Sequence, residues 1–242
     1  MPRPTQAFID LSALAHNLGV VRQYVPRSRI MAVVKADAYG HGLLHTASAL
    51  KDVDGFALLE LDAAISLRDA GYQQPILLLE GFFSTEELAL FEQYRLSAVI
   101  HHSEQIAMLS DSKHHNLDLF LKINTGMNRL GLAPEQFPQI MKALTDHPGI
   151  DSITLMTHFA SADDPLEEEE VFQQLRYFEA ITQNHKYPHS LANSAAIIRY
   201  PVTHADWVRP GIMLYGASPF ADKTASELNL KPVMTLSSKI IA

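Results

Sequence analysis

The sequence predicts an α/β protein whose parallel strands close into a (β/α)8 barrel. Short apolar runs rich in Val, Ile and Leu alternate with stretches whose apolar residues recur at helical spacing. Such runs are typical of parallel strands, because helices cover both faces of a parallel sheet. About eight runs fit into the 242 residues, a length at which eight strands close into a barrel. The expected strands are 30–34, 55–59, 75–79, 96–100, 117–123, 150–156, 190–193 and 207–214.

The two ends of the chain depart from this alternation. Residues 7–12 form a short extended piece, and Ser12 is expected to cap a helix over 13–24. Residues 217–230 are polar and turn-rich, and 232–241 have the pattern of a β element with no strand left to pair with it. We therefore expect residues 1–216 to form the barrel, and 217–242 to form a linker and the truncated start of a C-terminal β domain.

Composition argues against several classes of function. The net charge is −8 and no Lys/Arg run concentrates positive charge, so a nucleic-acid partner is not expected. No secretory leader and no window apolar enough to cross a bilayer are found, which predicts a soluble protein without a membrane partner. The absence of cysteine excludes disulfides and thiolate metal sites and fits a cytoplasmic location. No metal site is predicted.

Polar residues follow the apolar runs at the end where such a barrel carries its chemistry. Lys35 directly follows the first run; burial of its ammonium would lower its pKa and free the amine to form a Schiff base. Two glycines and an aromatic hydroxyl then follow within 36–42, and the glycines permit close approach of a ligand. Taken singly, these positions also fit a solvent-directed lysine, a core histidine, a helix cap, a turn or a salt bridge. The other polar or glycine positions are Arg129, His158, Asn193, Ser194, Arg209 and Gly211.

The motifs around these residues resemble those of the alanine racemase family, in the same order along nearly the whole chain. Residues 32–42, AVVKADAYGHG, are similar to its pyridoxal-phosphate attachment motif, and residues 208–216, VRPGIMLYG, to its last motif. Further similarity lies at 122–131, 156–160 and 192–195. The resemblance implies a TIM-like barrel followed by a β domain, a pyridoxal 5′-phosphate cofactor, and an isomerase that interconverts L- and D-alanine for peptidoglycan or for alanine catabolism.

The resemblance also implies a role for each residue of the site. Lys35 would hold the cofactor and act as one of two bases, and Arg209 would face the pyridine nitrogen. His158 would pack beside the ring and bind Arg209. Arg129 would reach the substrate carboxylate, braced by Lys122, which is often carbamylated in the family. The positions that match cofactor contacts near the phosphate are Tyr39, Asn193, Ser194, Gly211 and Ile212.

The chemistry of Arg209 can be argued from its side chain. A guanidinium does not release its proton at neutral pH, so a pyridine nitrogen beside it would stay unprotonated. The ring would then be a weaker electron sink, which favours reprotonation at the α-carbon over transamination.

Three interpretations are left open by the sequence. The first is the N-terminal barrel of an alanine racemase, a homodimer at full length. A two-base reaction needs a donor on the opposite face, which the family supplies as a tyrosine of the partner's β domain, so this fragment would be inactive or nearly so. The second is a single-domain pyridoxal-phosphate carrier without racemase activity, a class of about this length. The third is a racemase for a larger amino acid.

Overall fold

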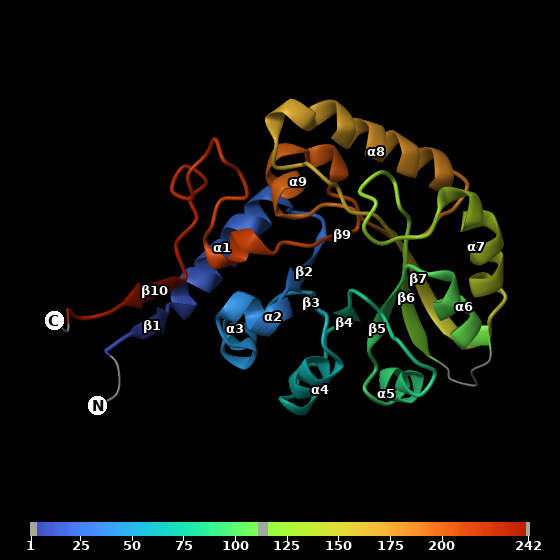
Figure 1. Cartoon of the computed structure of the whole chain (residues 1–242), viewed down its shortest axis with the longest axis horizontal. Coiled ribbons are helices and arrows are strands. Elements are labelled where there is room, and N and C mark those ends of the chain that lie inside the picture. Colours follow the sequence, from blue (N-terminus) through green and yellow to red (C-terminus); the bar gives the residue numbers. More distant parts are fainter. Residues whose placement is uncertain (1–3, 111–115, 241–242) are drawn as a thin grey trace.

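The computed structural model describes residues 4–110 and 116–240, and within them eight parallel strands close into a barrel (Figure 1). Their order in the barrel follows the sequence, and the last strand pairs back to the first. The strands are β2 (Arg29–Val33), β3 (Gly55–Leu58), β4 (Ile76–Leu78), β5 (Ser97–Ile100), β6 (Leu117–Lys122), β7 (Ile150–Met156), β8 (His189–Ser190) and β9 (Trp207–Val208). The predicted barrel is confirmed.

Helices cover the outside of this ring of strands (Figure 1). The helices are α1 (Leu11–Tyr24), α2 (Lys35–Gly40), α3 (Leu43–Ala49), α4 (Leu61–Asp69), α5 (Glu87–Gln93), α6 (Ser103–Ser110), α7 (Phe137–Thr145), α8 (Glu168–Thr182) and α9 (Ser194–Arg199), with 3₁₀ turns η1 (Pro134–Gln136), η2 (Pro165–Glu167), η3 (Pro201–Thr203) and η4 (Ile212–Tyr215). None of the helices in the described part of the chain is long and apolar enough to span a membrane.

The last two barrel strands are shorter than the sequence predicts. The apolar run expected over 207–214 is a strand only at Trp207–Val208, and the residues from 212 to 215 form the turn η4. Pro210 explains where the pairing stops, because its nitrogen has no hydrogen to donate to a neighbouring strand. Its carbonyl still accepts a hydrogen bond of 3.0 Å from the Val33 N–H. The chain therefore leaves the barrel after Pro210.

The first helix is capped by a different residue from the one expected. The helix α1 begins at Leu11, and Asp10 is its N-cap. The Asp10 carboxylate accepts hydrogen bonds from the Ser12 and Ala13 N–H groups at 2.9 and 3.1 Å, and the Ser12 hydroxyl also donates to it. These bonds lower the pKa of Asp10. A carboxylate is favoured there because a helix N-terminus carries partial positive charge.

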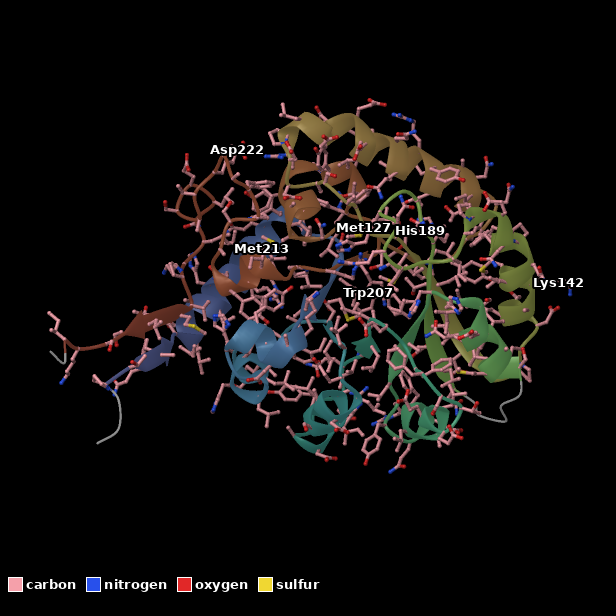
Figure 2. The ribbon with its side chains drawn as sticks, viewed as in Figure 1. Met127, Lys142, His189, Trp207, Met213 and Asp222 are labelled. Atoms are coloured by element: carbon pink, nitrogen blue, oxygen red, sulfur yellow. The ribbon has the colours of Figure 1, made fainter. Side chains whose placement is uncertain are left out.

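Two apolar layers hold the barrel together. An outer layer lies between the strands and the helices. An inner layer fills the barrel with side chains from alternate strand positions, and Trp207 lies at the centre of the view in Figure 2. The inner residues are Met31, Val33, Ala57, Leu77, Val99, Phe120, Met156 and Trp207. Because successive side chains on a strand point to opposite faces, the strands contribute to both layers.

The β element near the C-terminus does have a partner, contrary to the expectation of an unpaired strand. Strand β10 (Met234–Ser237) pairs antiparallel with β1 (Gln6–Ile9), from Gln6 opposite Ser237 to Ile9 opposite Met234. The pair lies outside the barrel (Figure 1). Residue 241 of the expected element lies outside the described residues. Sequence periodicity could not reveal this pairing, because its two strands lie at opposite ends of the chain.

A buried amide fastens the segment before β10 to α1. The Asn17 side chain is fully buried and donates to the carbonyls of Leu214 and Lys231 at 3.0 and 2.9 Å. Its oxygen accepts from the Lys231 N–H at 2.8 Å. Gly216 has φ +81°, and a Cβ there would lie 1.8 Å from the Lys231 carbonyl oxygen. Asn17 therefore satisfies three backbone groups where two segments approach closely.

Replacing Asn17 with leucine should destabilise the fold. Asn17→Leu keeps the branched shape of the side chain but leaves those backbone groups without partners, at a cost of about 1–3 kcal/mol in the free energy of unfolding. Urea unfolding followed by circular dichroism measures the change. Gln23→Leu, at an exposed position of the same helix, is the control and should change stability little. Equal stability of the two variants would contradict this role for Asn17.

Candidate functional site

A cavity of about 690 Å³ lies at the carboxyl ends of the barrel strands. The structure brings all ten residues singled out from the sequence to its wall. They are Lys35, Tyr39, Lys122, Arg129, His158, Asn193, Ser194, Arg209, Gly211 and Ile212. The expectation that distant polar residues meet at one rim is therefore correct in geometry, while their roles stay predictions.

Strand alternation explains how four of these side chains reach the cavity. Each follows an inward-facing apolar residue of the inner layer by two positions, so it continues the same face beyond the core. The pairs are Val33 and Lys35, Phe120 and Lys122, Met156 and His158, and Trp207 and Arg209. The charged groups thus begin where the apolar filling of the barrel ends.

Lys35 opens an unusual turn of backbone. The four residues from Ala36 to Tyr39 have φ between 51 and 54° and ψ between 34 and 54°, so this turn winds left-handed. Each such residue other than glycine costs about 1–2 kcal/mol. The Asp37 carboxylate contributes to holding the turn by accepting a 2.7 Å hydrogen bond from the Leu43 N–H. The turn places both Lys35 and Tyr39 at the cavity wall.

Tyr215 packs against this left-handed turn and the end of β2. Its ring stacks on Tyr39 with centroids 4.6 Å apart and lies 4.7 Å from the ring of His41. Its hydroxyl donates a 3.0 Å hydrogen bond to the carbonyl of Val33, at the end of β2. Burial raises the pKa values of Tyr215 and Tyr39, so both rings stay neutral hydroxyl donors near neutral pH. The backbone that carries Lys35 is therefore braced on two sides.

Arg209 is buried and tightly held. Its guanidinium donates to the Ser190 hydroxyl at 2.6 Å, to the carbonyls of Thr157 and Leu191 at 2.7 and 3.2 Å, and to His158 at 3.2 Å. Burial lowers the pKa of Arg209 to about 10, so the side chain stays charged at neutral pH. Its Nε has no partner among the described residues.

The contact with Arg209 fixes the state of His158. A guanidinium has no acceptor, so Nδ1 of His158 must accept the hydrogen bond. Burial, with the charge of Arg209 as the next cause, lowers the pKa of His158 well below its ordinary value. The ring is therefore neutral, and its proton lies on Nε2. This state follows from the chemistry of the pair and matches the predicted contact of His158 with Arg209.

Ser194 and Gly211 form a close crossing of backbone beside Tyr39. The Ser194 hydroxyl oxygen accepts from the N–H groups of Gly211 and Met213 at 2.9 and 3.4 Å. A Cβ on Gly211 would lie 2.6 Å from the Tyr39 hydroxyl oxygen, so only glycine leaves room for that phenol. Asn193 caps α9 through a 3.0 Å hydrogen bond from the Ala196 N–H. The helix cap considered for Ser194 from the sequence is therefore Asn193 instead, and Ser194 is the first residue of α9.

A compact loop after β6 carries Arg129. The Asn124 side-chain oxygen accepts from the N–H groups of Gly126 and Asn128, each at 3.1 Å, and its amide donates to the Asn128 side chain at 2.9 Å. Asn128 has φ +57°, a conformation that asparagine tolerates better than most residues. The Arg129 side chain makes no hydrogen bond or ion pair within residues 4–110 and 116–240, so its fork of donors is free for a ligand.

Several residues of the site were missed from the sequence. Glu80 and Asp163 lie in the cavity wall, and Glu80 directly follows the expected strand 75–79, which was a signal for it. Tyr215 lies in a quoted motif, but its stacking on Tyr39 depends on two segments far apart in the chain. Gln174 contacts the loops of the site from α8, and its signal was a polar residue within an apolar helix stripe.

Comparison with known proteins places the chain in a family. Residues 9–219 match the family model of the alanine racemase N-terminal domain. The chain belongs to the alanine racemase family. It is 58% identical over 243 residues to alanine racemase from Nitrosospira multiformis, and the alignment covers 100% of this chain and 68% of that protein. It is 48% identical to the catabolic alanine racemase of Klebsiella aerogenes, over 100% of this chain and 67% of that protein.

Solved structures of alanine racemases share the barrel. The alanine racemase from Acinetobacter baumannii superposes with a TM-score of 0.91 at 41% identity, over 100% of this chain and 72% of that chain. The biosynthetic alanine racemase from Pseudomonas aeruginosa gives a TM-score of 0.91 at 43% identity, over 97% of this chain and 66% of that chain. The family resemblance seen in the sequence is therefore confirmed, including the TIM-like barrel.

The cavity of this alanine racemase family member concentrates positive charge. Four cationic side chains face it, Lys35, Lys122, Arg129 and Arg209, whereas its carboxylates are Glu80 and Asp163. Lys122 is 7% exposed, and burial, reinforced by the charges of Arg209, Arg129 and Lys35, lowers its pKa to about 8. The lowering of a lysine pKa by burial, which the sequence suggested for Lys35, is large at Lys122. Lys35 itself is half-buried.

The lowered pKa of Lys122 predicts a pH-dependent stability. The pKa rises from about 8 in the folded chain to about 10.4 on unfolding. Between these values the unfolded chain binds more protons, so stability increases as the pH rises, and below pH 8 the folded chain bears the full cost of the buried ammonium. Lys122→Met lacks this ammonium, so its stability advantage over wild type should shrink by up to about 3 kcal/mol across that window.

Urea unfolding at a series of pH values from 7 to 10.5, in buffer freed of carbon dioxide so that Lys122 is an unmodified amine, measures this difference. Lys51→Met, at an exposed position, is the control and should show a constant offset from wild type. A constant offset for Lys122→Met as well would contradict the lowered pKa.

Proposed function

We propose that the chain is the cofactor-binding barrel of a pyridoxal 5′-phosphate-dependent alanine racemase, an isomerase that interconverts L- and D-alanine. The observation that carries the proposal is the meeting of Lys35 with the Arg209–His158 pair in one cationic cavity. Membership of the alanine racemase family supports it. We propose a cytoplasmic enzyme that supplies D-alanine for peptidoglycan or serves alanine catabolism.

The donors of the cavity fit a phosphorylated aldehyde and an amino acid. The excess of cationic side chains suits a phosphate and a carboxylate. The absence of a side chain at Gly211 leaves room for the Tyr39 hydroxyl at the cavity wall, which a Cβ would crowd. Within the cavity wall, Tyr39, Asn193, Ser194, Gly211 and Ile212 would hold the phosphate end of the cofactor. Residues of this kind bind a phosphate through hydroxyl and backbone N–H groups.

When bound, pyridoxal phosphate supplies an aldehyde for a lysine amine and an electron-withdrawing ring that acidifies the α-hydrogen of an amino acid. Lys35 would hold this group through Nζ, and its freed amine would remove or return the α-proton on one face of the substrate. The braced left-handed turn serves this role by restricting where Nζ can lie. A fixed position for the base lowers the cost of bringing it to the substrate.

Arg209 and His158 would set the protonation at the pyridine nitrogen. The guanidinium is charged near neutral pH because its pKa of about 10 is still well above 7. The free Nε–H of Arg209 would donate a hydrogen bond to that nitrogen. A guanidinium is too weak an acid to transfer its proton to the pyridine nitrogen. His158, neutral and accepting from Arg209, adds no second charge. This pair would keep the nitrogen unprotonated and favour return of the proton to the α-carbon.

Arg129 would bind the substrate carboxylate, and Lys122 would support Arg129. The exposed guanidinium of Arg129 offers two parallel donors to a carboxylate. Lys122 is partly unprotonated near its pKa of about 8, so its amine can add carbon dioxide with release of one proton. We include this carbamylation in the proposal because the resulting anion would brace Arg129 and relieve the repulsion among neighbouring cations.

The opposite face of the substrate needs a second proton donor. As the family resemblance implies, we propose that a tyrosine from the β domain of a partner subunit supplies it, in a homodimer of the full-length protein. In this proposal residues 1–216 form the barrel, and residues 217–242 lead into the β domain. The chain by itself would then bind cofactor with little or no racemase activity.

Covalent trapping tests the role of Lys35. Pyridoxal phosphate added to the chain should give a visible absorbance band, and borohydride reduction followed by peptide mapping should place the label on Lys35. Lys35→Ala should lose both signals, while Lys51→Ala, at an exposed position, should retain them. A label on any other lysine would contradict the proposal. Cofactor binding without racemisation by the full-length protein would indicate the carrier interpretation.

Crowding the Tyr39 hydroxyl tests the proposed phosphate site. Gly211→Ala places a methyl group 2.6 Å from that oxygen, so Tyr39 must move, and affinity for pyridoxal phosphate should fall about tenfold or more, equivalent to about 1.4 kcal/mol. Equilibrium titration by absorbance or fluorescence measures it. Gly19→Ala, where a Cβ meets nothing within 4 Å, is the matched control. Unchanged affinity in Gly211→Ala would argue against this site for the phosphate.

A further inference from the structure

A buried glutamine on α8 reaches inward to the loops of the cavity. Gln174 is 4% exposed. Its side-chain oxygen accepts from the Ala160 N–H at 3.0 Å, and its nitrogen donates to the His158 carbonyl at 3.2 Å and to the Thr125 hydroxyl at 3.4 Å. Thr125 belongs to the loop after β6, and His158 and Ala160 to the loop after β7. One amide thus joins a helix of the outer layer to two loops.

The contacts of Gln174 continue to Arg209. The hydroxyls of Thr125 and Thr157 are 2.7 Å apart, and the Thr157 hydroxyl donates to the Ile123 carbonyl at 3.0 Å. The Thr157 carbonyl accepts from Arg209 at 2.7 Å. Both threonines are buried. A continuous series of buried, hydrogen-bonded groups therefore connects Gln174 with the Arg209–His158 pair.

The position of Gln174 on its helix argues that this amide has a specific task. The buried stripe of α8 is otherwise mostly apolar, with Val171, Leu175 and Phe178 beside it. Helix packing alone would be served by an apolar side chain, because a buried amide without partners costs about 1–3 kcal/mol. Gly126 has φ +140°, and a Cβ there would lie 3.2 Å from Gln174 Cγ. The loop after β6 is thus shaped to let Gln174 approach.

The figures agree with this arrangement. In Figure 1 the long helix α8 passes over the loop that follows β6. Met127, a member of that loop, lies beneath the same helix in Figure 2. The hydrogen bond between Gln174 and Thr125 confirms that the two segments are in contact.

We propose that Gln174 is a positioning residue, which fixes the loops carrying His158 and Arg129 so that His158 meets Arg209 in a single orientation. This inference rests on the proposed function for its catalytic meaning. The geometry it describes belongs to the chain itself. Arg209 holds the His158 ring at Nδ1, and Gln174 holds the backbone of the same residue at its carbonyl.

The test compares Gln174→Met with Gln173→Met. Methionine at 174 keeps the length and burial of the side chain but loses all three hydrogen bonds. Position 173 is the adjacent exposed glutamine on the same helix, so its variant controls for helix stability. The first readout is nitrogen-15 NMR of His158 in the chain without cofactor, which distinguishes the two neutral tautomers. The second is the affinity for pyridoxal phosphate.

Wild type and Gln173→Met should show a single His158 tautomer with the proton on Nε2. Gln174→Met should show averaging between tautomers and about tenfold weaker cofactor binding, while it still unfolds cooperatively. An unchanged His158 signal and affinity, even with lower stability, would overturn the proposal and leave Gln174 a structural residue.

A second variant tests the proposal if Gln174→Met does not fold. Gln174→Glu keeps the acceptor for the Ala160 N–H, but in its ionised form loses the donors to His158 and Thr125. The same His158 readout then decides the proposal. Because that readout needs no cofactor, it is separable from the proposed function: absence of pyridoxal phosphate binding by wild type would overturn the function, while the tautomer of His158 would still decide the role of Gln174.

Discussion

The alternation of side chains along each barrel strand is the constraint on which the site depends. The face that packs the inner layer with Val33, Phe120 and Trp207 is the same face that, two residues later, presents charge to the cavity. The apolar filling below and the polar mouth above are therefore produced by one geometric rule. A shift of one residue in the register of a strand would turn its site residue into the outer layer.

Placing four cationic side chains around one cavity costs free energy, and a different interaction reduces this cost at each position. Arg209 remains charged because hydroxyl and carbonyl oxygens surround its guanidinium. Lys122 has no such partners within the described part of the chain, and its pKa falls instead. Arg129 lies at the exposed mouth, where water solvates it. A bound dianion would offset all of these costs together, which links the electrostatics of the cavity to the ligand proposed for it.

Much of the fold and of the site could be predicted from the sequence, because both depend on short-range patterns. Apolar runs mark the strands, and the carboxyl ends of parallel strands must meet at one rim, so Lys35, His158 and Arg209 were brought together correctly. The rest depends on contacts between distant segments. The stacking of Tyr215 on Tyr39 leaves no local signature. Gln174 is marked only as a polar residue in an apolar stripe, and that pattern does not identify the distant loops it contacts. The left-handed turn was not predicted either, because residues 36–39 contain no glycine, the residue that usually indicates positive φ.

The pairing of β1 with β10 has a consequence for the order in which the molecule assembles. During synthesis on the ribosome, residues 6–9 emerge well before their partners at 234–237. Closing so long a loop in a free chain is entropically costly, although the cost grows slowly with length. Folding of the residues between the two strands shortens that loop, and the hydrogen bonds of Asn17 with the Lys231 backbone bring the strands near each other. The sheet of β1 and β10 can therefore form only after the residues of the whole barrel have been synthesised.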